Sequence, residues 1–268
     1  MNHLMRELAP VNDAAWTQID DEATRSITHF LAARRLVDFA GPLGWQVSAV
    51  ATGRTEPVDV TPLGSVEAVR RRVLALIELR APFTLARGEL DTVERGGSDP
   101  DLRPVIDAGR AAALAEDHLV FHGDPAAGIS GIIAASPHEA VPIGDDFSAY
   151  PERVAKAVTV LRSADIAGPY AIALGTDCFT GVTETIERGG YPVLEHLRQL
   201  LGGPVVWAPA IQGAVVLSQR GGDYTLTVGQ DFSIGFRHAT GDSVALFIEE
   251  SVAFQVNTPE AAVHLAYS

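Results

Sequence analysis

Cysteine, lysine and long apolar runs are scarce in this sequence, and each scarcity excludes a class of protein. Cys178 is the single cysteine, so no disulfide can form within the chain, and a reducing cytoplasm is the expected setting. No stretch approaches the roughly 20 consecutive apolar residues that a membrane-spanning helix requires. The first residues include Arg6 and Glu7 but no apolar signal-peptide core, which predicts that the protein is not secreted.

Positive charge is scarce as well. The 268 residues include 20 lysines and arginines against 34 aspartates and glutamates, which gives a net charge of −14, and the only lysine is Lys156. Proteins that bind nucleic acid generally rely on basic patches to neutralise its phosphates, so this charge balance argues against nucleic acid as a partner. The composition, 47% hydrophobic and 20% charged, is ordinary for a globular protein.

The N-terminal part of the chain predicts a helix followed by an extended excursion. Asn12 or Asp13 can cap the helix. Its apolar face would comprise Trp16, Ile19, Ala23, Ile27, Phe30 and Leu31. Residues 45–90 then alternate between apolar and polar and are punctuated by glycine and proline, which indicates a long two-stranded hairpin. An isolated hairpin buries too little apolar surface to be stable, so we expect it to need a partner surface.

The remainder predicts an α+β protein with a mixed or antiparallel sheet. A second long helix should run from Pro104 to about Phe121, with Asp99 or Asp101 as its cap. Further helices are expected from about residue 151 past 161 and from 192 to 202. Strands are expected at residues 170–174, 205–207, 214–217, 224–228, 244–248 and 252–256.

No catalytic constellation emerges from these elements. His118 and His122 have the spacing of a zinc-binding pair, but Leu119 stands where a zinc protease has glutamate, and no third ligand follows. The adjacent Glu249 and Glu250 would point to opposite faces of a strand, so we expect a solvated strand edge and not an acid–base pair. The sequence therefore predicts no enzyme, no metal site and no catalytic residue.

The block at residues 220–236 gives the chain a family. It reads RGGDYTLTVGQDFSIGF, which predicts a glycine turn, a half-buried strand and a bend. It resembles the "ERGGDF…GQDLSIGY" block of the encapsulins, the shell proteins of bacterial and archaeal nanocompartments. Some members of that family carry linocin or bacteriocin labels. Further similar stretches follow in the same order as in that family. They are residues 6–10 (RELAP), 14–16 (AAW), 33–38 (ARRLVD), 77–80 (IELR), 89–91 (ELD), 94–96 (ERG), 168–170 (GPY) and 246–256 (LFIEESVAFQV).

This resemblance implies the HK97-like phage capsid fold, in which an N-terminal helix, an E-loop, a P-domain and an A-domain follow one another. The corresponding boundaries are residues 1–44 for the helix and the start of the P-domain, and 45–90 for the E-loop. The P-domain with its spine helix would span 91–134, the A-domain 135–222, and the return to the P-domain 223–268. Closed symmetry would give such subunits a finite icosahedral particle, in the smallest case of sixty copies. Because this E-loop contains no lysine, no isopeptide crosslink is expected.

The resemblance also implies partners. Encapsulin shells enclose cargo enzymes, typically a dye-decolourising peroxidase or a ferritin-like protein, and bind them through a C-terminal targeting peptide. In this sequence the peptide site would include Phe30, Leu31, Arg34, Leu36, Asp38, Gln230, Asp231, Ile234 and Phe254. An apolar groove with Arg34 and Asp38 at its ends would fix the direction of an extended peptide. The alternative is that Arg34 and Asp38 only pair with each other, four residues apart.

Two further expectations come from the family. The pore loop at the five-fold axis would include Glu184, Glu187 and Arg188. Some encapsulins stack a flavin on an aromatic residue near the ELD motif, but Arg87 and Gly88 occupy that place in this sequence, so we expect no flavin and no other cofactor.

Two other functions stay open at this stage. A phage or prophage head protein would have the same fold. A hydrolase or bacteriocin is the function that older labels in the family suggest, although the sequence offers no catalytic constellation for one.

Overall fold

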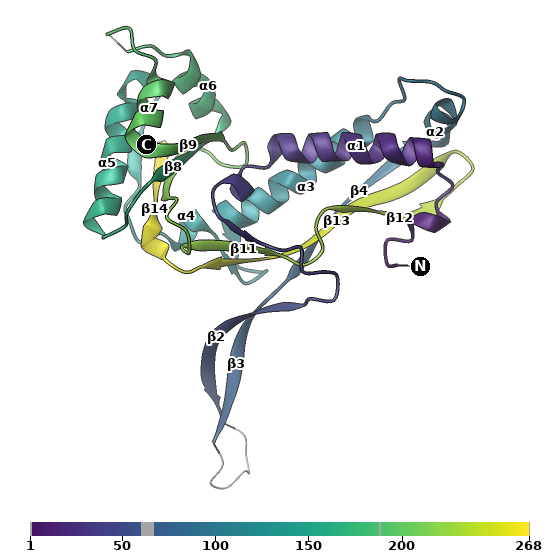
Figure 1. The fold of residues 1–268 in the computed structure, drawn as a ribbon, viewed down its shortest axis with the longest axis horizontal. Coiled ribbons are helices and arrows are strands. Elements are labelled where there is room, and N and C mark those ends of the chain that lie inside the picture. The colour runs from purple at the N-terminus through teal and green to yellow at the C-terminus, as the bar shows by residue number, and fades with distance from the viewer. Residues whose placement is uncertain (1, 60–66, 188, 268) are drawn as a thin grey trace.

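The computed structural model describes residues 2–59, 67–187 and 189–267, and these form a long body, a lobe at one end of it and a hairpin that projects from it (Figure 1). The helices are α1 (Asp13–Phe30), α2 (Arg87–Glu94), α3 (Arg103–Phe121), α4 (Ile132–Ala135), α5 (Tyr150–Ser163), α6 (Thr176–Glu184) and α7 (Val193–Leu201). The strands up to the lobe are β1 (Asp38–Ala40), β2 (Ala49–Val58), β3 (Ala68–Ala75), β4 (Ile77–Ala86), β5 (Gly123–Asp124), β6 (Ile129–Ser130) and β7 (Val141–Ile143). The later strands are β8 (Tyr170–Leu174), β9 (Gly202–Trp207), β10 (Ala214–Ser218), β11 (Tyr224–Val228), β12 (Ser233–Ala239), β13 (Ser243–Val256) and β14 (Ala262–Tyr267).

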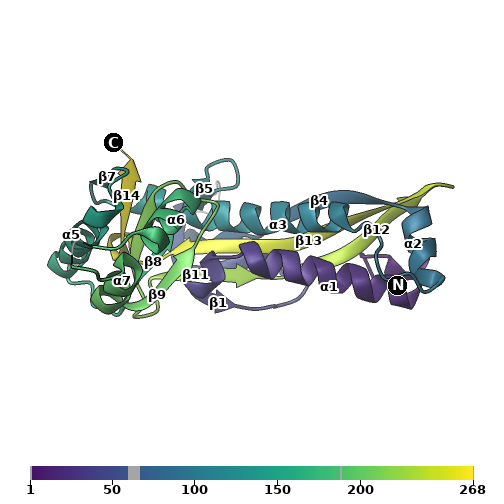
Figure 2. The same cartoon turned by 90° about the horizontal axis from the view of Figure 1, so that it is seen from above.

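The body is built around β13. Its first half lies between β4 and β12, and its second half pairs with β11, which in turn pairs with β1 in parallel. The helices α1 and α3 run side by side along this sheet (Figure 2). Ile19, Leu85, Val105, Leu246 and Ile248 are at most 1% exposed and fill the space between helices and sheet. Burying these side chains is the main stabilising contribution of the body.

The two helices approach closely because small residues line their contact. Gly109 on α3 has no side chain, and a Cβ at that position would lie 3.1 Å from the Ser26 Cβ of α1. The Ser26 hydroxyl donates a hydrogen bond to the Ile106 carbonyl at 2.8 Å, which satisfies a polar group that would otherwise be buried without a partner. The alanine-rich sequence of α3 thus sets the distance between the helices.

The lobe contains a second sheet, with the strand order β7-β14-β10-β8-β9. The strands β8 and β10 are buried along their whole length, which accounts for their unbroken apolar sequences. The helices α5, α6 and α7 surround this sheet (Figure 1). The chain returns to the body through Gly221 and Gly222, whose φ angles of +83° and +81° are conformations that glycine adopts readily.

The hairpin consists of β2 and β3 and is shorter than the sequence predicted. These strands pair only with each other, whereas β4, which we expected in the excursion at 45–90, joins β13 in the body sheet. The apolar side chains Val69 and Val73 are 65% and 54% exposed. The sequence did not indicate the boundary between β3 and β4, because the apolar run from Val69 to Leu85 continues across it. The hairpin strand and the body strand have the same apolar pattern.

Most other predicted elements are confirmed. Asn12 caps α1 by accepting a hydrogen bond from the Ala15 N–H at 2.8 Å, and α3 ends at Phe121 as expected. The prediction of Asp99 or Asp101 as the cap of α3 is wrong: the N-cap is Leu102, without a capping side-chain hydrogen bond, although the Asp101 carboxylate accepts from the Arg103 N–H at 3.0 Å. The sequence did not predict α2 or α6, which have short apolar faces. It also divided β13 into two strands at the polar residues in its middle.

The expectation that Glu249 and Glu250 lie at a solvated edge is wrong. Both side chains are 0% exposed in the middle of β13. They do point to opposite faces of the strand: Glu249 accepts from Arg80 Nε at 2.7 Å, and Glu250 faces Arg34. The counter-charges come from other elements of the fold, and their proximity is not visible in the sequence around the glutamates.

Truncation of Leu85 tests the body core. Leu85→Ala should lower the free energy of unfolding by about 2–5 kcal/mol, because it removes buried methyl groups from a side chain that is 0% exposed. The matched change Leu43→Ala, at a side chain that is 54% exposed, should cost less than about 0.5 kcal/mol. Urea unfolding of both variants would measure the difference; equal losses would contradict this account of the core.

Candidate peptide-binding groove

A groove with a volume of about 440 Å³ lies between α1, the N-terminal segment and the bend that precedes β12. Its floor is apolar and includes Ile27, Ile234 and Ile248, which are 8%, 5% and 1% exposed. Thr24 and Thr28 lie on its rim, on an exposed side of α1. An apolar floor with polar rims suits an extended peptide that inserts alternate side chains.

The rim near the start of the chain is electrically balanced. Arg6 Nη1 and Nη2 donate to the two carboxylate oxygens of Asp20 at 3.0 Å and 2.7 Å, and the Arg6 guanidinium also lies 3.9 Å from the ring centroid of Trp16. A bidentate pair of this kind is geometrically well defined and neutral as a unit. It orients the N-terminal segment along α1.

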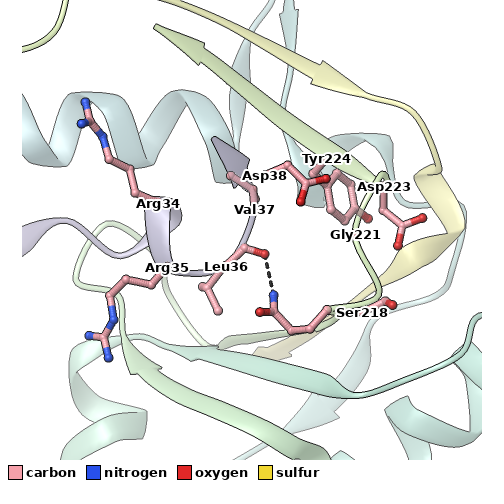
Figure 3. Close-up of a pocket in the computed structure, with 10 residues that line it drawn as sticks. Arg34, Arg35, Leu36, Val37, Asp38, Ser218, Gly221, Asp223 and Tyr224 are labelled. Atoms are coloured by element: carbon pink, nitrogen blue, oxygen red, sulfur yellow. Dashed lines mark hydrogen bonds between the residues drawn. The ribbon is translucent and has the colours of Figure 1, made fainter. Parts of the chain in front are cut away.

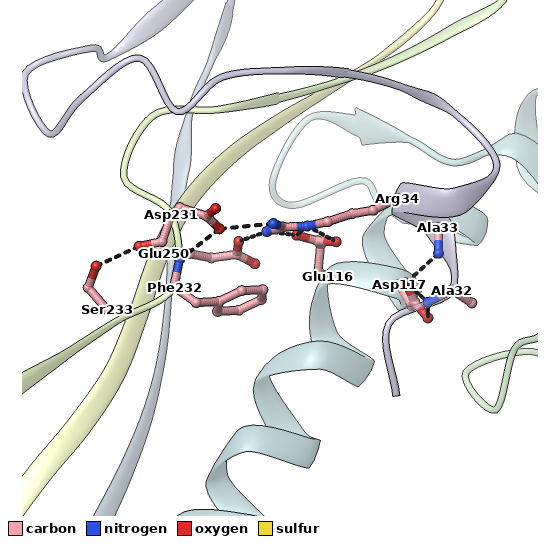
Figure 4. Close-up of polar contacts among 9 residues, drawn as sticks. All are labelled: Ala32, Ala33, Arg34, Glu116, Asp117, Asp231, Phe232, Ser233 and Glu250. Atoms are coloured by element: carbon pink, nitrogen blue, oxygen red, sulfur yellow. Dashed lines mark hydrogen bonds and ion pairs between the residues drawn. The ribbon is translucent and has the colours of Figure 1, made fainter. Parts of the chain in front are cut away.

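Arg34 and Asp231 line the opposite end of the groove, and the buried carboxyl groups of Glu116 and Glu250 lie behind them. Figure 4 shows how Arg34 faces the three acids. Arg34 Nε donates to Glu116 Oε1 at 3.0 Å and to Oε2 at 2.8 Å, and Nη2 donates to Glu116 Oε2 at 2.6 Å and to Glu250 Oε2 at 3.0 Å. Nη1 lies 2.9 Å from Asp231 Oδ1. The guanidinium is also within 5.0 Å of the ring centroids of Phe39 and Phe232. Arg34 thereby joins the segment after α1 to α3, β13 and the bend before β12.

Burial acts most strongly on two of these carboxyl groups. Glu116 and Glu250 are 0% exposed, and one arginine faces both. Burial raises the pKa of Glu250 well above its usual range, and the neighbouring Glu116 charge raises it further. Arg34 makes three hydrogen-bond contacts with Glu116 and one with Glu250, so the Glu116 charge is the better compensated and the proton is expected on Glu250.

Asp117 adds a further buried acid beside this cluster. Its carboxylate accepts hydrogen bonds from the backbone N–H groups of Ala32 and Ala33 at 2.9 Å each, and so fixes the turn that leads from α1 to Arg34. Burial raises the pKa of Asp117 to about 7, although the two backbone donors oppose the shift. The segment that presents Arg34 is therefore held by α3 at two adjacent residues.

The structure brings together part of the predicted peptide site. Leu31, Arg34, Asp231 and Ile234 line the groove. Gln230 lies at the bend and donates to the Ser233 hydroxyl at 2.5 Å, so it shapes the loop that carries Asp231.

Phe30, which we also predicted for the site, lies beyond the groove. Its ring packs against Trp207 at 5.6 Å between centroids, and Arg110 lies over it at 5.0 Å.

Three other predicted site residues lie elsewhere, around or behind a smaller pocket of about 100 Å³. Leu36 and Asp38 line this pocket together with Tyr224 (Figure 3). Leu36 is 3% exposed, and its carbonyl accepts from Gln219 Nε2 at 2.6 Å. Asp38 accepts from the Gly222 N–H and not from Arg34, so the alternative of an Arg34–Asp38 pair is not found. Phe254 is 3% exposed in the core, stacked on Tyr224.

The sequence did not single out several residues of the groove. Phe232 borders Arg34, and Leu4 and Arg6 form the N-terminal rim. Glu116 is the strongest partner of Arg34, yet it reads as one more charge on a long helix. Only its position in the sequence could have indicated a buried role: with Asp117 it forms a pair of adjacent acids inside an otherwise apolar helical stretch.

Two of the predicted pore residues, Glu184 and Glu187, lie at the tip of the lobe. Glu184 ends α6, and Glu187 Oε1 lies 2.6 Å from His196 Nδ1 on α7. Arg188 lies outside the described residues. Ile186 and Tyr191 on the same tip are 63% and 40% exposed.

Other chemistry is not evident in the part of the chain that the structure describes. Within residues 2–59, 67–187 and 189–267, no group of three His, Cys, Asp or Glu side chains is placed to hold a metal ion. His122 Nε2 lies 3.2 Å from the Ala210 carbonyl, and the Cys178 thiol is buried within hydrogen-bonding distance of Tyr150. None of the described helices combines the length and the apolar character needed to cross a bilayer.

Neutral replacement of each buried glutamate tests which of the two carries a proton. Because the folded state binds the Glu250 proton more tightly than the unfolded chain, stability should decline as pH rises above the usual pKa of 4.5. Glu250→Gln mimics the protonated acid, so it should leave stability near pH 7 almost unchanged and flatten this decline. Glu116→Gln removes the charge that holds Arg34 and should cost about 3–5 kcal/mol.

Thermal unfolding of the parent and both variants from pH 5 to pH 9 would measure these effects. Asp117 adds its own decline up to about pH 7 in all three proteins, so the Glu250 effect is clearest above that pH. Equal losses in the two variants, or an unchanged pH slope in Glu250→Gln, would show that the proton does not reside on Glu250.

Comparison with known proteins places this fold. The nearly full-length structural matches include the virus-like particle of Pyrococcus furiosus, with a TM-score of 0.66 and 15% identity over 92% of this chain and 98% of that one. The capsid of the myovirus XM1 has a TM-score of 0.59 and 11% identity over 86% of this chain and 90% of that one. These likenesses show the HK97-like capsid fold that the sequence predicted.

Sequence comparison shows the family. Residues 1–253 match the Linocin_M18 family, described as encapsulating protein for peroxidase. The type 1 encapsulin shell protein of Rhodospirillum rubrum is 50% identical over 99% of this chain and 96% of its own length. That of Mycobacterium tuberculosis is 43% identical over the full length of both. These relatives are structural shell proteins and not enzymes. The chain belongs to the encapsulin shell protein family.

Proposed function

We propose that copies of this chain assemble into a closed icosahedral shell, with sixty copies as the smallest arrangement, that forms a nanocompartment in the cytoplasm. The observation that carries the proposal is the β2–β3 hairpin, which projects from the body without a neighbouring strand (Figure 1). A two-stranded hairpin with exposed valines is not stable on its own, so a second copy is the surface that it lacks.

The charge of the hairpin supports the same partner. Its described strands carry Arg54, Arg70, Arg71 and Arg72 against Glu56, an excess of positive charge in a chain whose net charge is −14. Opposite charges favour contact between the hairpin of one copy and the acidic surface of another. The many like charges elsewhere would oppose assembly, so the apolar and basic surface of the hairpin must outweigh them.

We further propose that the groove binds the C-terminal tail of a cargo enzyme. The description of the family as encapsulating a peroxidase favours a peroxidase, and a ferritin-like protein is the other candidate. In support, Leu31, Ile27 and Ile234 offer apolar contacts, and the groove is open along α1. The lobe tip with Glu184 and Glu187 would line a pore for small substrates.

The alternative functions are less well supported. The phage capsids share the fold at 11% identity for the myovirus XM1, whereas encapsulin shell proteins are 43–50% identical. A phage head protein is therefore the weaker proposal. A hydrolase or bacteriocin has no support in the described residues, where Glu116, Glu249 and His122 are engaged in structural contacts.

Charge introduced on the hairpin tests assembly. The purified protein should form uniform hollow spheres tens of nanometres across in negative-stain micrographs. The double variant Val69→Asp and Val73→Asp should stay as small soluble species in size-exclusion chromatography, because both side chains are exposed in the single copy and would be buried between copies. Its circular dichroism should match that of the parent; a parent that remains a monomer or dimer would refute the shell.

Blocking the groove tests cargo binding. Thr24→Trp or Thr28→Trp should fill the groove from its exposed rim and lower cargo capture at least tenfold, without changing the core. Arg25→Trp adds the same bulk on another side of α1 and should capture cargo like the parent.

The probe is a fluorescent protein that carries the tail of the peroxidase or ferritin-like enzyme encoded beside the shell gene. It is co-expressed with each variant, and fluorescence per shell is measured. Equal capture by all three variants would place the tail outside the groove.

A further inference from the structure

The C-terminal end of α3 connects the body to the lobe. Ala113 on this helix is 0% exposed in the body core, whereas Phe121 is 0% exposed in the core that extends into the lobe. Residues 208–213, which connect the lobe strands β9 and β10, contact the helix at His122, whose Nε2 lies 3.2 Å from the Ala210 carbonyl. This contact, together with the neighbouring strand β14, is called the joint below.

Three histidines gather at the joint. His118 and His122 lie one turn apart on α3, with 4.8 Å between their ring centroids. His264 lies on β14 and is hydrogen-bonded to the backbone of Gln212, two residues from the carbonyl that faces His122. The charges of His118 and His264 both lower the pKa of His122, so the three rings are within electrostatic reach of one another. Rings from the body and from the lobe therefore meet at one short segment of the chain.

The acids nearest to these rings along the chain have other partners. Glu116 pairs with Arg34, and Asp117 accepts from the backbone of the turn after α1. Asp124 accepts from backbone N–H groups of its own turn. The other segments packed around the joint, which are α4, β7, β10 and residues 208–213, contain no titratable side chain.

The helix α5 also contacts β14, and it carries the remaining charges near the joint. Its charged side chains are Glu152, Arg153, Lys156 and Arg162. They shift the pKa of neither His122 nor His264. Among the described residues, a proton on this cluster therefore meets other histidines and no counter-charge.

Protonation of the cluster is unfavourable while the joint is closed. Burial lowers the pKa of His122, and the Ala210 carbonyl only partly opposes the shift. Burial also lowers the pKa of His264, whose Nε2 is buried with no hydrogen-bond partner among the described residues. A proton added to this atom would create a charged donor without an acceptor. The negative end of the α3 dipole suits one protonated ring, but it does not compensate two or three.

We propose that His118, His122 and His264 make the joint sensitive to acid: below about pH 6, protonation separates the end of α3 from residues 208–213 and β14, and the lobe becomes mobile relative to the body. The closed joint binds fewer protons than the open one. Its stability is therefore complete above the usual histidine pKa of 6.5 and is lost as the pH falls. This is a property of each copy, so it rests neither on the proposed shell nor on the cargo groove.

Acid acts on the body in the opposite direction. Burial raises the pKa of Asp117 to about 7 and raises that of Glu250 well above its usual range, so the folded body binds these protons more tightly than the unfolded chain. The contribution of these two groups to stability increases as the pH falls. A loss of protection at the joint without a loss in α1 therefore distinguishes the proposal from general acid unfolding.

Hydrogen exchange followed by mass spectrometry tests the joint in the full-length protein. Each proton taken up on opening shifts the equilibrium by up to tenfold per pH unit, so exchange of residues 208–213 and 262–266 should accelerate about tenfold between pH 7.5 and pH 5.5. Rates are corrected for the intrinsic pH dependence of amide exchange. His264→Gln cannot take up the proton and should lose most of the acceleration. His238→Gln, at an exposed histidine on β12, should retain it.

His118→Gln is a second variant, at an exposed ring, and it decides the question if His264→Gln fails to fold. It removes one of the charges that act on His122, so the acceleration should fall at least twofold. Light scattering at each pH checks that parent and variant have the same particle size. An acceleration that is unchanged in His118→Gln, or that is as large in α1 as at the joint, would overturn the proposal.

Discussion

The pairing of Arg34 with Glu116 is the interaction on which the arrangement of the body depends. It joins a short segment after α1 to the middle of α3, and through Glu250 and Asp231 it extends to β13 and to the bend before β12. Because Glu116 and Glu250 are fully buried, removing the arginine would leave charge in a dry interior, at a cost of several kcal/mol. The four segments must therefore meet in one geometry, and the groove between them takes its shape from that requirement.

The sequence predicts element boundaries that depend on neighbouring residues, but it does not predict pairings between segments that are distant in the chain. Asn12, Pro104 and the glycines at 221 and 222 mark boundaries through local chemistry, and those boundaries are found where expected. The sequence alone did not separate the end of the hairpin from strand β4, because both segments alternate between apolar and polar residues. Only pairing with β13, about 170 residues away, assigns β4 to the body. The burial of Glu249 and Glu250 has the same origin, since their counter-charges come from distant segments.

The predicted peptide site shows the same division in a smaller space. Leu31, Arg34, Asp231 and Ile234 were assigned by resemblance, and the structure places them around one groove. Leu36 and Asp38 follow Arg34 closely in sequence, and Phe254 lies on β13, the strand that pairs with β12, but all three face the core or the smaller pocket. A strand or tight turn reverses the direction of a side chain within one residue, so nearness along the chain does not place a residue in a site.

Sharing Arg34 between the fold and the groove has a consequence for how the site can vary. A residue that holds four segments together cannot also be exchanged to suit different tails, since each exchange would destabilise the body. Asp231 is less constrained: it is partly exposed, and the buried pair of Arg34 with Glu116 would persist without it. The apolar floor is equally fixed, because Ile27, Ile234 and Ile248 belong to the body core. In the proposed cargo groove, specificity would therefore be confined to the rim, where Thr24, Thr28 and Asp231 lie outside the buried core.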